Sequence, residues 1–160
     1  RIPLRVTHND TKLNNILFDE DTNEGICVID LDTIMPGLSL YDFGDAIRFG
    51  GNTTYEDDDN LDNVKISVEL FEAFARGFLS SCAKALTKTE VDCLAFSAKL
   101  MTFECGVRFL TDYIDGDVYF GTAYPEHNLD RCRTQFKLVA DMESKMDEMI
   151  RITKEAYASL

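Results

Sequence analysis

The fold is decided by two short stretches of the sequence, HNDTKLNN at residues 8–15 and VIDLD at residues 28–32. Apolar and β-branched patterning around them predicts three short strands, at residues 4–7, 15–19 and 25–33. The polar residues 19–25 end in glycine and should close a hairpin between the last two strands. Residues 8–14 are polar without being turn-like, and polar loops of this kind often carry binding and catalytic side chains.

The two stretches together carry the groups that phosphoryl transfer requires. That reaction needs one carboxylate near the attacking hydroxyl and further oxygen ligands that hold Mg²⁺ against the nucleotide phosphates. Asp10 would orient the acceptor hydroxyl and take its proton, while the Asn15 amide and the Asp30 carboxylate would coordinate Mg²⁺. An ordinary polar turn is the alternative, but the order of these residues on a strand–loop–strand frame favours the catalytic interpretation.

This pattern resembles the aminoglycoside phosphotransferase and choline kinase superfamily, the small-molecule relatives of protein kinases. In that family a His-x-Asp-x-x-x-x-Asn loop supplies the catalytic Asp and a metal-binding Asn, and an Ile-Asp-Phe/Leu-Asp/Glu strand supplies the metal-binding Asp. The resemblance therefore implies a kinase that uses ATP and Mg²⁺. It assigns catalysis to Asp10, and metal and nucleotide binding to Asn15 and Asp30.

Further roles near the loop follow from the same resemblance. Lys12 would contact and neutralise the transferred phosphoryl group, as a Lys at this position does in serine/threonine protein kinases. His8 would pack the loop, and Asp42 would be a buried acceptor that pins it. Asp42 also begins an Asp-Phe-Gly sequence, the metal motif of protein kinases, but it opens a helical segment, so Asp30 is the better metal ligand. Asp32 stays open between a supporting role and a second metal.

Within the superfamily, the sequence is most similar to bacterial N-acetylhexosamine 1-kinases, over residues 7–12, 28–45, 106–113 and 116–120. These enzymes phosphorylate the anomeric hydroxyl of N-acetylglucosamine or N-acetylgalactosamine. The resemblance thus implies an amino-sugar substrate, with Arg108 and Tyr119 as sugar contacts. Two alternatives stay open. Arg108 stands at helical spacing from Glu104 and Asp112 and could form surface ion pairs, and Tyr119 with Phe120 could cap the helical core.

Beyond the hairpin the sequence pattern becomes helical. Apolar residues recur at three- and four-residue spacing in a short piece at 40–49 and in three long segments, at 61–86, 87–115 and 128–160. Thr87 and Glu90 predict a capping box for the second long helix, and Asn128 is the expected N-cap of the third. Met142, Met146 and Met149 recur at helical spacing, which is typical of a core-facing stripe.

The expected fold class is α+β and mainly helical. It corresponds to the C-terminal lobe of a protein-kinase-like fold, with a short catalytic β-hairpin followed by three long helices. Residues 1–49 would form the catalytic loop and metal-binding hairpin segment, and residues 50–160 the helical subdomain with the acceptor-side helix and loop. The acidic run at 56–59 is typical of a solvated surface loop.

Charge and composition restrict the partners. The formal net charge of −13 argues against nucleic acid, because phosphate contacts need clustered Lys and Arg. No apolar run approaches the roughly 20 residues of a membrane helix. The five cysteines show no metal-ligand spacing, so we expect reduced, mostly buried thiols in a cytoplasmic protein. Kinases of the superfamily that the sequence resembles hold the nucleotide with an N-terminal lobe, and none of its elements precedes Arg1. The resemblance therefore implies a missing N-terminal lobe of the same protein and an isolated lobe that is inactive.

The leading hypothesis is an ATP-dependent phosphotransferase that acts on the anomeric hydroxyl of an amino sugar. A kinase of another hydroxyl compound, such as choline, homoserine or an aminoglycoside, stays open because the acidic balance suits a cationic acceptor. A kinase-like binding module without catalysis is the third possibility. It is disfavoured because Asp10, Asn15 and Asp30 are all present.

Overall fold

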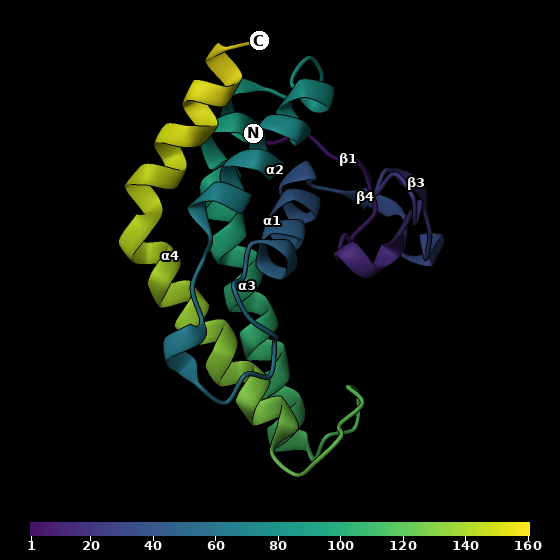
Figure 1. Cartoon of the computed structure of the whole chain (residues 1–160), viewed down its shortest axis with the longest axis vertical. Helices are drawn as coiled ribbons and strands as arrows, with labels where there is room; N and C mark the ends of the chain where they lie inside the picture. The colour runs from purple at the N-terminus through teal and green to yellow at the C-terminus, as the bar shows by residue number, and fades with distance from the viewer.

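The computed structural model describes the whole chain, residues 1–160 (Figure 1). Two small antiparallel sheets come first: β1 (Arg5–Thr7) pairs with β4 (Met35–Gly37), and β2 (Ile16–Phe18) pairs with β3 (Gly25–Val28). They lie to one side of the helices that form the rest of the molecule (Figure 1). The expected mainly helical α+β fold is confirmed.

The hairpin between β2 and β3 forms where the sequence predicts it. At its tip the Asp19 carboxylate accepts hydrogen bonds from the N–H groups of Asp21 (3.0 Å) and Thr22 (2.9 Å). The predicted strand 25–33 is too long, however. Asp30 has a left-handed backbone (φ 61°), which strands do not tolerate, and a 3-10 turn at Leu31–Thr33 follows it.

The strand β4 was not predicted from the sequence. It is three residues long and contains Pro36, which has no N–H to donate to a ladder. In the β1–β4 pair Pro36 stands opposite Val6, and the Thr7 hydroxyl donates to the Met35 carbonyl at 2.9 Å. This pairing brings the loop that follows β1 against the segment that follows the hairpin.

Four helices complete the fold: α1 (Ser39–Gly50), α2 (Val68–Cys82), α3 (Lys88–Asp115) and α4 (His127–Ala158). The predicted helix over 61–86 is shorter than expected, because residues 61–63 form a 3-10 turn and the Ser67 hydroxyl caps α2 by accepting the Leu70 N–H (3.2 Å). The predicted capping box of α3 is confirmed. The Thr87 hydroxyl accepts the Glu90 N–H (3.3 Å), and the Glu90 carboxylate accepts the Thr87 N–H (2.7 Å).

The prediction that Asn128 caps the last helix is wrong. The N-cap of α4 is Glu126, with a left-handed backbone (φ 68°), and Asn128 lies inside the first turn. Its side chain is fully buried, and its amide donates to the carboxylates of Asp112 (2.8 Å) and Asp117 (2.9 Å). Asn128 therefore joins α4 to the end of α3 and to the loop after it.

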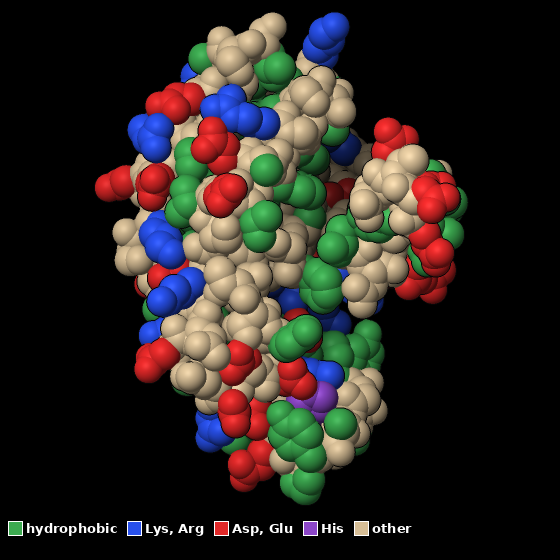
Figure 2. Space-filling model, in the orientation of Figure 1, with side chains coloured by type: hydrophobic (Ala, Val, Ile, Leu, Met, Phe, Trp, Pro, Cys, Tyr) green, Lys and Arg blue, Asp and Glu red, His purple; other side chains and the backbone are tan.

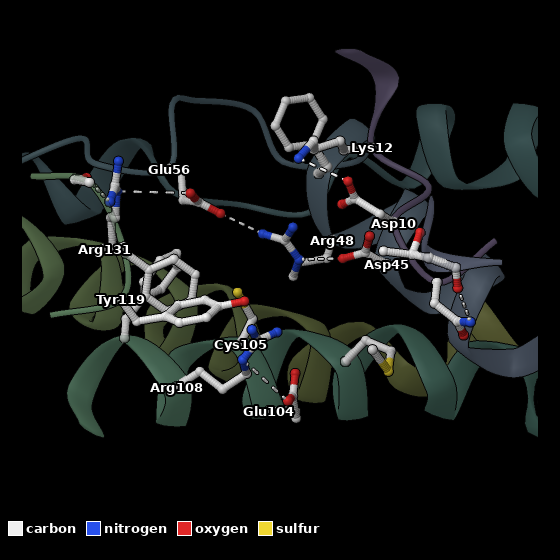
Figure 3. A pocket seen from close by; sticks show the side chains of 17 residues that line it. Asp10, Lys12, Asp45, Arg48, Glu56, Glu104, Cys105, Arg108, Tyr119 and Arg131 are labelled. Atoms are coloured by element: carbon white, nitrogen blue, oxygen red, sulfur yellow. Dashed lines mark hydrogen bonds and ion pairs between the residues drawn. The ribbon is translucent and has the colours of Figure 1, made fainter. Parts of the chain in front are cut away.

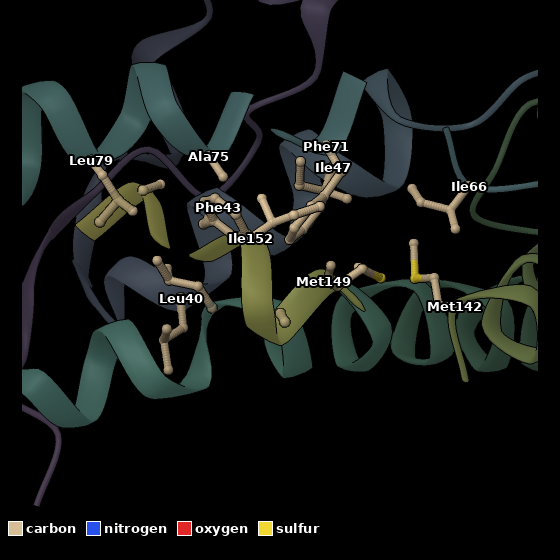
Figure 4. Close-up of a cluster of buried hydrophobic side chains, with 14 of the residues drawn as sticks. Leu40, Phe43, Ile47, Ile66, Phe71, Ala75, Leu79, Met142, Met149 and Ile152 are labelled. Atoms are coloured by element: carbon tan, nitrogen blue, oxygen red, sulfur yellow. The ribbon is translucent and has the colours of Figure 1, made fainter. Parts of the chain in front are cut away.

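The helices pack around one apolar core (Figure 4). α3 and α4 lie side by side along the molecule, α1 packs across α3, and α2 packs on α4 (Figure 1). Met142 and Met149 are fully buried and Met146 packs against the same cluster, so the predicted core role of the methionine stripe is confirmed. The largest buried aliphatic and aromatic members are Phe43, Ile47, Ile66, Phe71, Leu79, Leu94, Leu138 and Ile152.

Helix α1 approaches α3 at Gly44. A Cβ atom at this position would lie 2.5 Å from the Ser97 carbonyl oxygen and 2.6 Å from Met101 Cγ, closer than real Cβ atoms approach. The glycine thus allows near backbone contact between the two helices. The core side of α1 carries Phe43 and Ile47, which leaves its polar residues to face the sheets and the end of α3.

No helix combines the length and the apolar composition needed to span a membrane. All five cysteines are free. Only Cys132 is buried; Cys82, Cys93 and Cys105 are half-buried and Cys27 on β3 is exposed, so the expectation of mostly buried thiols is wrong.

Candidate active site

The loop between β1 and β2 is fastened to the first turn of α1 through Asp42. Its carboxylate accepts the N–H groups of His8 (2.9 Å) and Asn9 (2.8 Å), and its carbonyl accepts the Thr11 hydroxyl (2.6 Å). Asn9 has a left-handed backbone (φ 64°), so the loop turns at this residue. Asp42, only partly buried, thus makes the contacts that fix the shape of the loop, and none with the side chains of Asp10, Asn15 or Asp30.

His8 connects the loop to the end of the hairpin. Its Nε2 lies 3.1 Å from the Ile29 carbonyl, and its own carbonyl accepts the Thr33 hydroxyl at 2.6 Å. Its Nδ1 is buried without a hydrogen-bond partner. Asn9 and Thr33 were missed from the sequence, although the Asn9 amide donates to the Thr33 carbonyl (3.1 Å). Only the three-dimensional approach of the two segments reveals that pair.

Asp10, Lys12 and Asn15 meet on this loop. The Asn15 amide donates to the Asp10 carboxylate at 2.7 Å and to the Asp10 carbonyl at 2.9 Å, and Lys12 Nζ lies 3.0 Å from the same carboxylate. Burial acts to raise the pKa of Asp10, but the contacts with Lys12 and Asn15 outweigh it and hold that pKa below its usual value. The carboxylate is therefore ionised at neutral pH and can accept a hydrogen bond from a hydroxyl.

Asn15 and Asp30 offer oxygen atoms for a metal. The backbone carbonyl of Asn15 accepts the N–H of Ile29 at 2.9 Å. Asp30 follows Ile29 directly, so its backbone lies close to that of Asn15. Asn15 commits its amide N–H groups to Asp10, and its Oδ1 has no partner within the chain. The Asp30 side chain is exposed and also makes no hydrogen bond. One amide and one carboxylate oxygen suit Mg²⁺, which binds few protein ligands and keeps several waters. Asp32 is exposed and makes no contact that would assign it a role.

A cavity of about 470 Å³ opens beside Asp10 and Lys12 (Figure 3). In Figure 2 a hollow separates the hairpin from the helices, and basic side chains are visible inside it. Its charged lining is balanced, with the acids Asp10, Asp45, Glu56 and Glu104 and the bases Lys12, Arg48, Arg108 and Arg131. Its apolar lining includes Phe49, Met101, Phe109, Tyr119 and Phe120. The catalytic loop, α1, α3 and the loops after α1 and α3 all contribute.

Arg108 and Tyr119 both line this cavity. The Arg108 guanidinium carbon lies 5.7 Å from the centre of the Tyr119 ring and 5.3 Å from that of Phe120. Of the two ion pairs that the helical spacing suggests for Arg108, only the one with Glu104 is present, with Nε 3.8 Å from Oε1. Tyr119 is 73% exposed, so the alternative that it caps the core is wrong, whereas Phe120 does pack on Phe109.

Asp112 forms no ion pair with Arg108 and instead shapes the loop that carries Tyr119. Its carboxylate accepts the N–H groups of Val118 (3.0 Å), Tyr119 (2.8 Å) and Phe120 (2.9 Å). Burial acts to raise the pKa of Asp112, but these N–H groups outweigh it and lower that pKa. The ionised carboxylate thus fixes the loop at the cavity rim.

The acidic run 56–59 is not the plain solvated loop that was predicted. Glu56 pairs with Arg48 of α1, with 2.5 Å between Oε1 and Nη1, and lies 4.0 Å from Arg131 of α4. Burial acts to lower the pKa of Arg48, but the nearby carboxylates, Glu56 among them, raise it well above its usual value. Cys105 lies in the same part of the cavity, and burial raises the pKa of its thiol to about 12. The signal in the sequence was Arg48 itself, a charged residue beside the core-facing Ile47.

One comparison with known proteins bears on this geometry. Residues 1–79 match the family model described as "Phosphotransferase enzyme family" (APH). The matched segment contains the catalytic loop, the hairpin and α1, and it ends within α2. The match therefore supports a phosphotransferase of the kinase-like superfamily.

Proposed function

We propose that the protein is an ATP-dependent kinase of a small-molecule hydroxyl, and that its acceptor is the anomeric hydroxyl of an N-acetylated amino sugar. The observation that carries this proposal is the Asp10–Asn15 pair, joined at 2.7 Å beside a polar cavity of about 470 Å³. A cavity of that size suits a small ligand. The match to phosphotransferases supports the reaction class.

In the proposed reaction Asp10 accepts a hydrogen bond from the acceptor hydroxyl and then its proton. The acceptor oxygen forms a bond to the γ-phosphorus of ATP as the bond to the β–γ bridging oxygen breaks, and ADP leaves. Lys12, which pairs with Asp10 at 3.0 Å, would move toward the transferred group and offset its charge. Asn15 and Asp30 would hold Mg²⁺, which neutralises phosphate charge when bound.

The lining of the cavity favours an uncharged polyhydroxyl acceptor over a cationic one. Four acids and four bases line it, so the formal charges cancel. A quaternary ammonium group needs open aromatic faces, but the guanidinium of Arg108 lies over the rings of Tyr119 and Phe120. Alternating carboxylates and guanidinium groups instead offer both acceptors and donors to sugar hydroxyls.

The test is a substrate panel with the full-length protein and Mg-ATP. N-Acetylglucosamine, N-acetylgalactosamine, choline, homoserine and an aminoglycoside are compared by ADP release, and products are identified by phosphorus NMR. We expect a sugar 1-phosphate as product. Turnover confined to the cationic alcohols would refute the amino-sugar assignment.

A variant pair tests the role of Asp10. Asp10→Asn should lower kcat by at least about a hundredfold, since it removes the proton acceptor. Asp92→Asn is the control, because Asp92 is exposed on α3 and contacts only Lys88. Unchanged turnover in Asp10→Asn would exclude Asp10 as the base.

A further inference from the structure

A row of alternating charges, Asp45, Arg48, Glu56 and Arg131, crosses one wall of the cavity (Figure 3). Arg48 Nε donates to Asp45 Oδ1 at 2.8 Å, and Arg48 Nη1 donates to Glu56 Oε1 at 2.5 Å. Arg131 Nε lies 4.0 Å from Glu56 Oε2. The row thus connects α1, the loop after it and α4.

The members of this row differ in their access to the cavity. The Arg48 side chain is 9% exposed and that of Glu56 is 30% exposed. A carboxylate can accept about four hydrogen bonds, and Glu56 accepts only one, since 4.0 Å is too long for a second from Arg131. Glu56 therefore keeps acceptor capacity at the cavity wall, where its carboxylate is held by the buried guanidinium of Arg48.

Contacts between α4 and the two residues that follow Glu56 also hold this loop in place. His127 Nδ1 accepts the Ala123 N–H at 3.0 Å, so its Nε2 carries the proton that points to the Asp57 carboxylate, 3.1 Å away. The Asp58 carbonyl accepts the Thr134 hydroxyl at 3.4 Å. Both contacts come from α4, so the Glu56 carboxylate is preorganised and loses little conformational entropy when a ligand binds.

We propose that Glu56 is the specificity-determining residue of the acceptor site. Its carboxylate accepts hydrogen bonds from ring hydroxyls of the sugar other than the one that is phosphorylated, and Arg48 positions it. This inference rests on the proposed function. It also predicts discrimination against choline, whose single hydroxyl is consumed in the reaction at Asp10, so that none is left to donate to Glu56.

The experiment compares Glu56→Gln with the wild type in the full-length protein. Calorimetry measures the affinity for N-acetylglucosamine and for each of its monodeoxy analogues, and steady-state assays give the KM for sugar and for ATP. Loss of a hydrogen bond to a charged group should weaken sugar binding about tenfold or more, with the KM for ATP unchanged. One analogue lacks the hydroxyl that Glu56 binds. The wild type should bind this analogue more weakly than it binds the parent sugar, whereas Glu56→Gln should bind the two with equal affinity.

Two further variants keep the result interpretable. Asp59 lies in the same acidic run but is exposed and makes no hydrogen bond or ion pair. The Asp59→Asn variant should therefore bind sugar as the wild type does. Glu56→Asp retains the charge if Glu56→Gln fails to fold, and it should show the same analogue preference with smaller loss of affinity. Wild-type affinity in Glu56→Gln, or an equal loss for every analogue, would overturn the inference alone. No sugar binding by the wild type would overturn the proposed function with it.

Discussion

Replacement of Glu90 by Gln should lower the free energy of unfolding by about 3 kcal/mol at neutral pH. Glu90 is fully buried at the start of α3, where its carboxylate accepts hydrogen bonds from Arg5 Nε (2.6 Å) and Nη2 (2.8 Å), Ser39 Oγ (2.8 Å), and Thr87 N (2.7 Å) and Oγ1 (2.8 Å). The amide of Gln keeps the shape but has one acceptor oxygen, and its NH₂ would face donors. The expected loss lies at the lower end of the range for a broken buried pair, because the side chain of Arg5 is 25% exposed and solvent screens part of the attraction.

The contribution of Glu90 to stability should also depend on pH. Hydrogen bonds from Arg5 hold the pKa of Glu90 far below its usual value, and those from Thr87 and Ser39 act in the same direction. The unfolded chain therefore binds the proton first, so this stability is present above the unfolded-state pKa of about 4.3 and is lost as pH falls toward the folded-state pKa. The wild-type advantage over Glu90→Gln should thus be constant near neutrality and should shrink in acid.

Urea unfolding followed by circular dichroism measures the loss of stability and its dependence on pH. In thermal unfolding the melting temperature of Glu90→Gln should fall by roughly 6–12 °C for a domain of this size. Glu72→Gln is the matched control. Glu72 pairs with Arg76 on the surface of α2, where its side chain is 41% exposed, and its loss should change the free energy of unfolding by less than about 1 kcal/mol. A similarly small change in Glu90→Gln, or a difference from wild type that does not vary with pH, would refute the reasoning.

Three further predictions concern the helix crossing and the site. Gly44→Ala should destabilise the protein by about 1–3 kcal/mol in thermal unfolding because its Cβ meets the α3 backbone, whereas Gly77→Ala, with open space around it on α2, should stabilise it by about 0.5–1 kcal/mol. Lys12→Met should raise the pKa of Asp10 and move the acid limb of the kcat/KM profile of the full-length protein to higher pH; an unmoved limb would show that Lys12 does not act on that carboxylate. Cys105 should resist iodoacetamide in the folded protein and react in urea, as read by mass spectrometry, because burial raises the pKa of its thiol to about 12; rapid alkylation of the native protein would contradict this.

Local patterns were sufficient to predict that the hairpin and the helices exist, but not where β3 ends or where α2 begins. The capping box at Thr87 and Glu90 predicts where α3 begins, and the apolar spacing predicts how long it is. The two stretches around Asp10 and Asp30 also predict the segment that matches the phosphotransferase family model, because the carboxylate and amide stand at fixed spacing on a short frame.

What the sequence did not reveal depends on contacts between distant segments. β4 is short and contains Pro36, and its pairing with β1 leaves no local pattern. Asn128 looks like a cap, but burial against Asp112 at 2.8 Å gives it a tertiary role instead. Glu56 lies in a run of like charges that suggests full solvation, and only the fold brings α1 and α4 to it, with Arg48 and Arg131.

The close contact of α1 with α3 at Gly44 fixes one wall of the cavity, whereas the walls formed by loops can change in sequence. Asp42 fastens the catalytic loop to α1, and Gly44 holds α1 against α3, so Asp10 keeps its place relative to the α3 face. The opposite walls come from the loops after α1 and α3, where Glu56 pairs with Arg48 and the Asp112 carboxylate accepts the N–H groups of residues 118–120. A laboratory search for kinases of new acceptors should therefore randomise those two loops and leave α1 unchanged, because the loops can alter the shape of the cavity without moving Asp10, the proposed proton acceptor.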